Sequence, residues 1–146
     1  MKLCVDAETV GPWVAEKTGG AWTPQRGAAI GKISDNTLVA GVIYEDFNKV
    51  NVVCHIAGEG VWATREFLNA IFDYPFNQLK VNRITVPVDG SNAKSIALVE
   101  RLGFKIEARL LRATPTNDLL IYAMFKDDCK YIKGEYLGKS INACNA

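Results

Sequence analysis

Two short segments of this chain carry residues whose types and spacing could bind a charged ligand or act on it. The first is Asn92-x-x-Ser95, which follows an alternating apolar stretch at residues 84–88 and turn residues at 89–91. Asparagine is a good helix N-cap, able to accept a hydrogen bond from the backbone N–H near Ser95. Gly103 then suits the left-handed cap that ends many helices. The pattern predicts strand, turn and helix, and its polar pair either caps the helix or faces a ligand there.

The second segment is His55-Ile-Ala-Gly58-Glu-Gly60, which lies between a predicted strand and a predicted helix. Glycines let a backbone approach a phosphate closely, and N–H groups at a helix start point at anionic oxygen. A carboxylate at Glu59 would repel a phosphate unless it points away. Ala63 completes a loose dinucleotide-site match, but the antiparallel hairpin before it disfavours a doubly wound sheet. The segment therefore predicts a phosphate-binding loop of another kind.

The order of the apolar patterns predicts the elements that position these segments. Residues 28–34 and 38–44 form an antiparallel hairpin. The strand at 51–56, the helix at 61–74 and the strand at 83–88 favour a parallel, right-handed crossover. The sequence therefore predicts an α/β (α+β) fold with a mixed, mostly antiparallel central sheet and helices on both faces. The remaining predictions are a helix at 9–18 with Pro12 in its first turn, a helix end at Pro75, and strands at 105–113 and 119–126.

Size and charge limit the class of protein. The chain has 146 residues, 49% of them apolar, which is enough for one domain with a sizeable core. We expect a single domain over residues 1–146, with its core at about 8–130 and an unassigned tail at 131–146. The net charge of +1 gives no electrostatic reason to expect a nucleic-acid or membrane partner. No apolar run approaches the roughly 20 residues of a membrane-spanning helix.

Cysteine and histidine usage argues against a metal site. The chain has four cysteines without a C-x-x-C pair and one histidine, which does not suit zinc. Acidic residues follow the first methionine too early for a secretory signal. We interpret the cysteines as reduced thiols of a cytoplasmic protein: Cys4, Cys54, Cys129 and Cys144.

The segment V-P-V-D-G-S-N-A-K-S-I-A-L-V-E-R-L-G-F at residues 86–104 resembles the acyl-CoA-binding arm of the GCN5-related N-acetyltransferases. The glycine segment is similar to the pyrophosphate loop of that family, with His55 where glutamine or arginine is usual. The resemblance implies the acyl-CoA N-acyltransferase fold, splayed between two parallel strands, with the pantetheine arm of acetyl-CoA in the gap near Pro87. The cofactor contacts that it implies are Cys54, His55, Ile56, Gly58, Gly60, Val61, Asn92 and Ser95.

The same resemblance suggests how acetyl transfer would occur. The family usually has a tyrosine as general acid at the position of Val99, and a branch that includes the ribosomal-protein acetyltransferases also lacks it. On that branch Ser95 would protonate the thiolate, and Asn92 would bond the cofactor or the acceptor. Tyr122 is a second candidate acid, since D-x-x-x-Y ending at this residue matches the same branch, although it could also be a core tyrosine.

The general base is left open by the sequence. Glu45, Asp46 and Asp118 lie at predicted strand ends that could border the gap. His55 could be a base near neutral pH, but its place in the loop favours contact with the cofactor, and a base acting through water needs no fixed partner. A separate feature is the pair Arg109 and Arg112, which could meet an anionic substrate.

The implied function is N-acetyl transfer from acetyl-CoA to a primary amine of a protein or a small molecule, by direct attack in a ternary complex. We expect no metal, no nucleic acid and no membrane partner, and a monomer or homodimer. The alternative keeps the fold without the chemistry, as a catalytically silent module that binds CoA or a protein.

Overall fold

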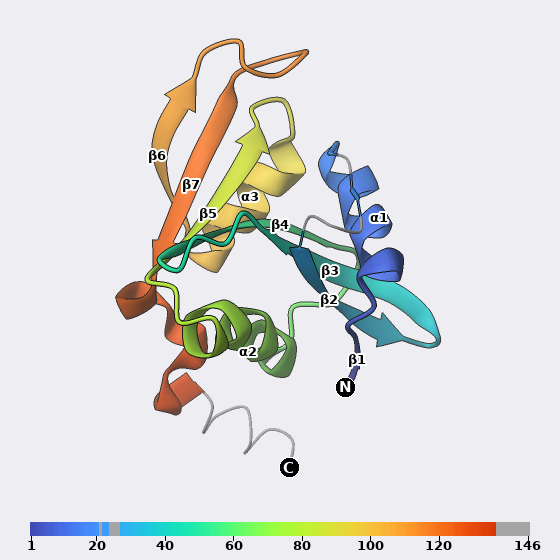
Figure 1. The fold of residues 1–146 in the computed structure, drawn as a ribbon. Coiled ribbons are helices and arrows are strands. Elements are labelled where there is room, and N and C mark those ends of the chain that lie inside the picture. The colour runs from blue at the N-terminus through green and yellow to red at the C-terminus, as the bar shows by residue number, and fades with distance from the viewer. Residues whose placement is uncertain (21, 24–26, 137–146) are drawn as a thin grey trace.

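A seven-stranded sheet in the order β1-β2-β3-β4-β5-β7-β6 organises the protein (Figure 1). The computed structural model describes residues 1–20, 22–23 and 27–136. Neighbouring strands are antiparallel except β4 and β5, which are parallel. The predicted mixed, mostly antiparallel sheet is therefore confirmed. Its strands are β1 (Lys2–Cys4), β2 (Gly27–Ser34), β3 (Thr37–Glu45), β4 (Asn51–Gly58), β5 (Arg83–Asp89), β6 (Lys105–Leu110) and β7 (Leu119–Phe125).

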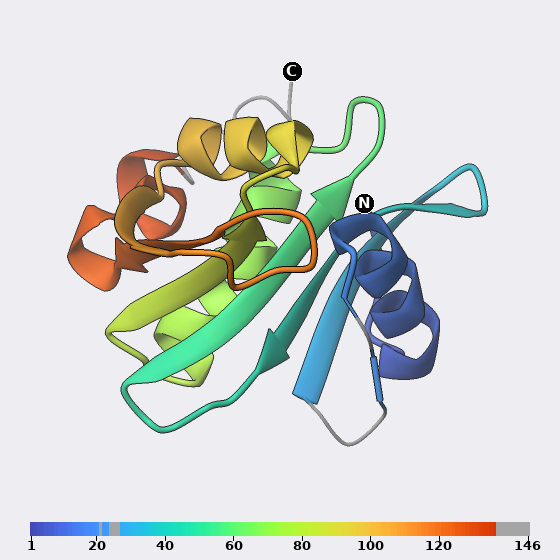
Figure 2. The same cartoon turned by 90° about the horizontal axis from the view of Figure 1, so that it is seen from above.

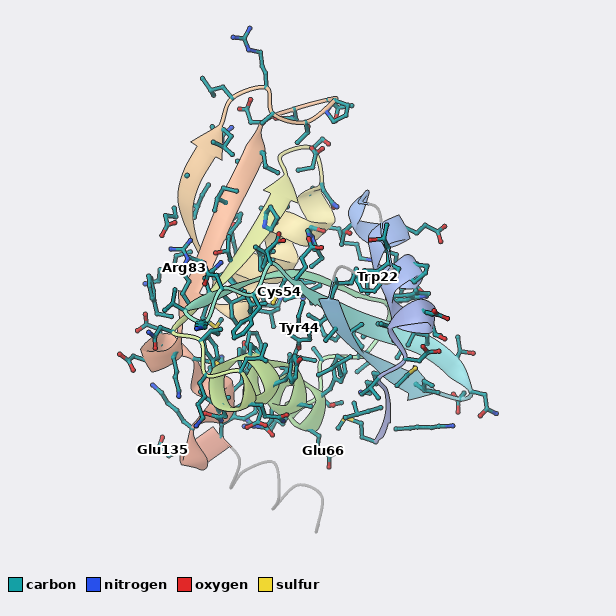
Figure 3. The ribbon with its side chains drawn as sticks, in the orientation of Figure 1. Trp22, Tyr44, Cys54, Glu66, Arg83 and Glu135 are labelled. Carbon is teal, nitrogen blue, oxygen red and sulfur yellow. The ribbon has the colours of Figure 1, made fainter. Side chains whose placement is uncertain are left out.

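Helices cover both faces of the sheet, as predicted. Helix α1 (Ala7–Thr18) lies over β2, β3 and β4, apart from α2 (Arg65–Asp73) and α3 (Ala93–Leu102) (Figures 1 and 2). The close approach of α1 depends on glycine, because a Cβ built on Gly41 would lie 2.7 Å from the side chain of Val14. The larger core packs α2 and α3 against the opposite face. It includes the side chains of Tyr44 and Cys54, which lie in the interior of the molecule (Figure 3).

Strands β4 and β5 separate after a short paired stretch. They pair only from Asn51 to Val53 and from Arg83 to Thr85. Beyond these residues β4 pairs only with β3, and β5 pairs only with β7, so the two strands diverge (Figure 1). Pro87, which cannot donate to a strand ladder, lies in the diverging part of β5. The predicted gap between two parallel strands is thus confirmed.

Helix α2 differs from its prediction at both ends. It begins at Arg65 rather than at residue 61, because Thr64 is its N-cap and accepts a hydrogen bond from the N–H of Phe67. It does not end at Pro75 but continues as a π-helical turn, η1 (Tyr74–Gln78). In α-helical register the residue at 75 would donate to the Ile71 carbonyl, and a proline has no N–H to do so.

The buried hydroxyl of Tyr44 replaces that missing donor. It donates to the Ile71 carbonyl at 2.6 Å. Burial raises the pKa of Tyr44 well above its ordinary value, which keeps the hydroxyl protonated. This contact joins β3 to the last turn of α2 and explains how the helix passes Pro75 without a bare carbonyl.

Two further boundaries differ from the sequence predictions. Helix α1 begins at Ala7 with Asp6 as its N-cap, so Pro12 lies inside the helix rather than in its first turn. Strand β6 ends at Leu110 instead of residue 113. After β7 the chain forms two short 3₁₀ turns, η2 (Lys126–Asp128) and η3 (Lys130–Ile132). The core reaches into this tail, because Tyr131 stacks on Phe72 with ring centres 4.8 Å apart.

Two expected absences can be compared only with the described part of the chain. Within it, no helix is long and apolar enough to cross a membrane. The described residues also hold no cluster of histidine, cysteine and acidic side chains suited to a metal ion. Cys4, Cys54 and Cys129 are free thiols, and Cys144 lies outside the described residues.

Candidate active site

Three adjoining cavities follow the gap between β4 and β5. The first, here called the loop cavity, has a volume of about 270 Å³ and lies between the β4–α2 loop and α3. It shares Ile56, Asn92 and Ser95 with a small gap cavity of about 20 Å³. The gap cavity shares residues 18, 55 and 87 with a third space of about 420 Å³, here called the α1 cavity. The three cavities therefore adjoin one another along the gap, from the α3 side of the sheet to the α1 side.

Glycine is favoured at residues 58 and 60 of the loop for two different structural reasons. Gly60 has a φ of +64°, and a Cβ built there meets no atom within 4 Å. Its conformation, rather than its surroundings, favours glycine. A Cβ on Gly58 would instead lie 2.3 Å from the indole of Trp62. Trp62 is buried and packs edge-to-face on Phe67, so it holds the loop against the core.

Basic side chains surround the loop cavity. Lys94 and Arg101 of α3 and Lys17 of α1 line it. Lys17 forms an ion pair with Glu59. The hydrogen bond from Lys17, followed by its charge, holds the pKa of Glu59 below its ordinary value. The carboxylate that was expected to repel a phosphate is thus paired with a lysine that faces the same cavity.

None of these three basic residues was identified from the sequence. Lys94 and Arg101 are seven positions apart in one helix, a spacing that places them on the same face. That signal was present in the sequence and was missed. Lys17 had no such signal, because only the packing of α1 on the sheet brings it to the loop.

The start of α3 has the predicted cap. The Asn92 side-chain oxygen accepts a hydrogen bond from the N–H of Ser95 at 3.0 Å. Both residues are half-buried and line the loop cavity and the gap cavity. The structure therefore combines the two interpretations of this pair, since a capping asparagine also borders the space where a ligand would lie.

On the α1 side, His55 and Glu45 form a close pair. Ile43 of β3 opposes His55 of β4, so Glu45 is the diagonal neighbour of His55 on the same face. Nε2 of His55 lies 2.7 Å from Oε1 of Glu45. The histidine side chain is 22% exposed and the glutamate side chain 5%. Both line the α1 cavity together with Asp46, and His55 also lines the gap cavity.

Two predicted residues lie in the core instead of on these cavities. The Cys54 side chain is 1% exposed, and burial raises the pKa of its thiol. Only the backbone of Cys54 could therefore meet a ligand. Tyr122 is 3% exposed, and its pKa is raised by burial first and then by the charge and hydrogen bond of Glu100. It lines none of the three cavities formed by the described residues.

The remaining candidates lie in two places, at the β6–β7 turn and in β4 with the loop that follows it. Asp118 lies at the β6–β7 turn, where its carboxylate accepts from Arg109 Nη1 at 2.9 Å and from the N–H of Arg112 at 2.8 Å. The N–H of Arg112, followed by Arg109, lowers the pKa of Asp118. Asp118 thus pairs with the guanidinium of Arg109, whereas it binds Arg112 only through the backbone N–H. Val61 is 98% exposed and lines none of the three cavities formed by the described residues, whereas Ile56, Gly58 and Gly60 line the loop cavity.

Comparisons with known proteins agree with this geometry. No protein-family model matches the chain. A curated relative from Bacillus subtilis (strain 168), described as "Putative ribosomal N-acetyltransferase YdaF", is 26% identical over 113 residues, which are 68% of this chain and 60% of the relative. The chain therefore matches less than two thirds of the length of that relative.

Two solved structures share the fold over most of their length. The F149A mutant of spermidine N-acetyltransferase SpeG from Vibrio cholerae superposes with a TM-score of 0.69 at 15% identity, covering 92% of this chain and 99% of that one. An acetyltransferase of the GNAT family from Bacillus anthracis gives a TM-score of 0.62 at 17% identity, covering 87% and 96%. The resemblance predicted from the sequence is thereby confirmed, and the chain has the fold of the GCN5-related N-acetyltransferases.

Proposed function

We propose that this protein transfers an acetyl group from acetyl-CoA to a primary amine. The observation that carries the proposal is the series of adjoining cavities along the gap between β4 and β5, in which each cavity shares lining residues with the next. Two substrates entering from opposite faces of the sheet would meet at the gap cavity, and such placement supplies much of the rate of a two-substrate reaction. The N-acetyltransferases that share this fold support the same reaction.

The loop cavity fits the acyl donor. Lys17, Lys94 and Arg101 supply positive charge for the phosphates of CoA, and the left-handed Gly60 turns the loop backbone there. Among the described residues, no strand pairs with the β5-facing side of β4 after Val53, so its backbone groups are available to the amides of a pantetheine arm. Acetyl-CoA is the donor whose shape and charge these features suit.

In the proposed reaction the amine nitrogen attacks the thioester carbonyl carbon, an N–C bond forms and the C–S bond breaks. His55, oriented by Glu45 at 2.7 Å, accepts the proton that the amine loses. The departing thiolate takes the proton of the Ser95 hydroxyl, and solvent returns a proton to Ser95. We assign the acid to Ser95 rather than Tyr122 because Ser95 lines the gap cavity. Asn92 orders the start of α3 at this point.

A silent CoA-binding module is the second candidate, favoured by one observation. Val99, where the family usually has its tyrosine acid, is 2% exposed and forms an apolar wall of the gap cavity. Titration with acetyl-CoA followed by release of free CoA against a panel of amines tests both candidates. We expect binding and amine-dependent release. Binding without release would support the silent module, and an unchanged melting curve at millimolar acetyl-CoA would exclude both.

Three finer features belong to the same proposal. The net charge of +1 supports a protein that has no nucleic-acid or membrane partner. Its free thiols suit the cytoplasm. We propose a monomer or a homodimer.

A further inference from the structure

The α1 cavity has a chemistry of its own. Apolar side chains from α1 and four strands form most of its wall, and four of them are only partly buried: Val53, Pro87, Leu119 and Ile121. Partly exposed apolar groups gain free energy when a ligand covers them, by about 25 cal/mol per Å². The volume of about 420 Å³ lies in the range of small-molecule sites. The wall therefore fits an acceptor with an apolar body.

The charged groups of this cavity are few and lie together. Glu45 and Asp46 are adjacent in sequence, and Glu45 is already within 2.7 Å of His55. Among the described residues that line the α1 cavity there is no lysine or arginine. Among these described residues, an acceptor with a carboxylate or phosphate would therefore meet acidic groups and no lysine or arginine.

A polyamine fits this wall poorly. Spermidine keeps two ammonium groups after one of its amines has lost a proton. Among the described residues of the wall, Asp46 is the carboxylate outside the His55–Glu45 pair, so it can pair with one ammonium group and the wall offers the second ammonium group no further carboxylate. Placing a charge there without a partner is strongly unfavourable.

We infer that the acceptor is a small primary amine with a single cationic group and an apolar alkyl or aryl body. Its nitrogen lies at His55 and its body covers Pro87, Leu119 and Ile121. The inference rests on the proposed acetyl transfer and specifies the acceptor of that reaction.

The test compares 2-phenylethylamine and 3-methylbutylamine with spermidine as acceptors, with 2-phenylethanol as a control that lacks the amine. Release of free CoA from acetyl-CoA gives kcat/KM for each compound. One methylene group in an apolar pocket changes kcat/KM by about 10- to 200-fold. We therefore expect the apolar monoamines to exceed spermidine by at least about tenfold. Equal values, or a preference for spermidine, would overturn the inference.

A variant that places a carboxylate on the apolar wall tests the same inference, with a matched control elsewhere on the sheet. Ile121→Glu should lower kcat/KM for 2-phenylethylamine at least about tenfold and raise it for spermidine. The control is Ile106→Glu on β6, where the side chain is 53% exposed and outside the α1 cavity, and which should leave both values unchanged. If Ile121→Glu does not fold, Leu119→Asp at the first residue of β7 replaces it. Unchanged preferences in the folded variant would contradict the inference.

Direct binding separates this inference from the proposed function. Calorimetry of each amine with the CoA-saturated protein measures binding without turnover. The calorimetry could show binding of 2-phenylethylamine but not of spermidine, while the turnover assay shows no release of CoA from acetyl-CoA. That result would support the proposed class of amine at this site and overturn the proposed function. Binding of spermidine, or of none of the amines, would overturn the acceptor class whatever the rate of turnover.

Discussion

Replacing Gly58 with alanine distinguishes packing from phosphate approach as the reason for this glycine. The added Cβ would lie 2.3 Å from Cε2 of Trp62, well inside van der Waals contact. Trp62 is 7% exposed and rests on Phe67, so it has little room to move. Overpacking of this kind costs about 1–3 kcal/mol. We expect Gly58→Ala to lower the free energy of unfolding by this amount, measured by urea denaturation at unchanged m-value.

The companion variants separate the causes. In the double variant with Trp62→Leu the clash is removed, and we expect a favourable coupling of about 0.5–3 kcal/mol, as for residues in direct contact. Gly60→Ala is the matched control, because its cost of roughly 1–2 kcal/mol comes from the left-handed backbone and not from a neighbour. It should therefore show no coupling with Trp62→Leu.

Acetyl-CoA affinity, measured on the wild type, Gly58→Ala, Trp62→Leu and the double variant, completes the test. If Trp62 is the sole reason for glycine at residue 58, the double variant should recover both stability and the acetyl-CoA affinity of Trp62→Leu alone. Recovered stability without recovered affinity would show that the Gly58 backbone also approaches the donor. A cost below about 0.5 kcal/mol for Gly58→Ala, with no coupling to Trp62, would refute the packing explanation.

Three further substitutions test the site and its support. Ser95→Ala should lower turnover about 10²- to 10⁴-fold with acetyl-CoA affinity nearly intact, whereas Tyr122→Phe should leave turnover unchanged; the reverse result would move the acid to Tyr122. His55→Gln should lower kcat by a similar factor while acetyl-CoA binding, followed by calorimetry, stays the same, and an unaltered kcat would point to a water-mediated base. Tyr44→Phe should cost about 1–3 kcal/mol in urea denaturation, because it leaves the Ile71 carbonyl without its donor, and a neutral effect would contradict that hydrogen bond.

The course of the chain was largely predictable because it depends on local patterns. Alternating apolar residues gave the hairpin of β2 and β3, and the long helical connection gave the parallel pair of β4 and β5. Pro87 then pointed to the place where those strands part. The end of α2 was not predictable in this way, because the donor that lets it pass Pro75 is Tyr44, distant in sequence. Local propensity sets where a helix is expected to stop, and tertiary hydrogen bonding decides whether it does.

The paired side chains of the site depend on register and packing. His55 and Glu45 meet because Ile43 opposes His55, and a shift of one residue would turn either side chain to the other face of the sheet. The turn between β3 and β4 sets this register, and the sequence predicts a turn there without its geometry. The ion pair between Lys17 and Glu59 is still harder to predict from the sequence, because the orientation of a whole helix on the sheet brings the two residues together.

The proposed donor side and acceptor side of the site are built differently. This difference limits how far the substrate can be inferred from a shared fold. On the proposed donor side, the separated strands, the left-handed Gly60 and the start of α3 are features of the backbone, and they lie beside the basic side chains of the loop cavity. Such backbone features tolerate changes of side chain, which is consistent with one fold at 15% identity. On the acceptor side, side chains such as Ile121 and Leu119 form the wall. Neither residue lines the loop cavity, so the acceptor must be derived from this chain's own residues rather than from its structural neighbours.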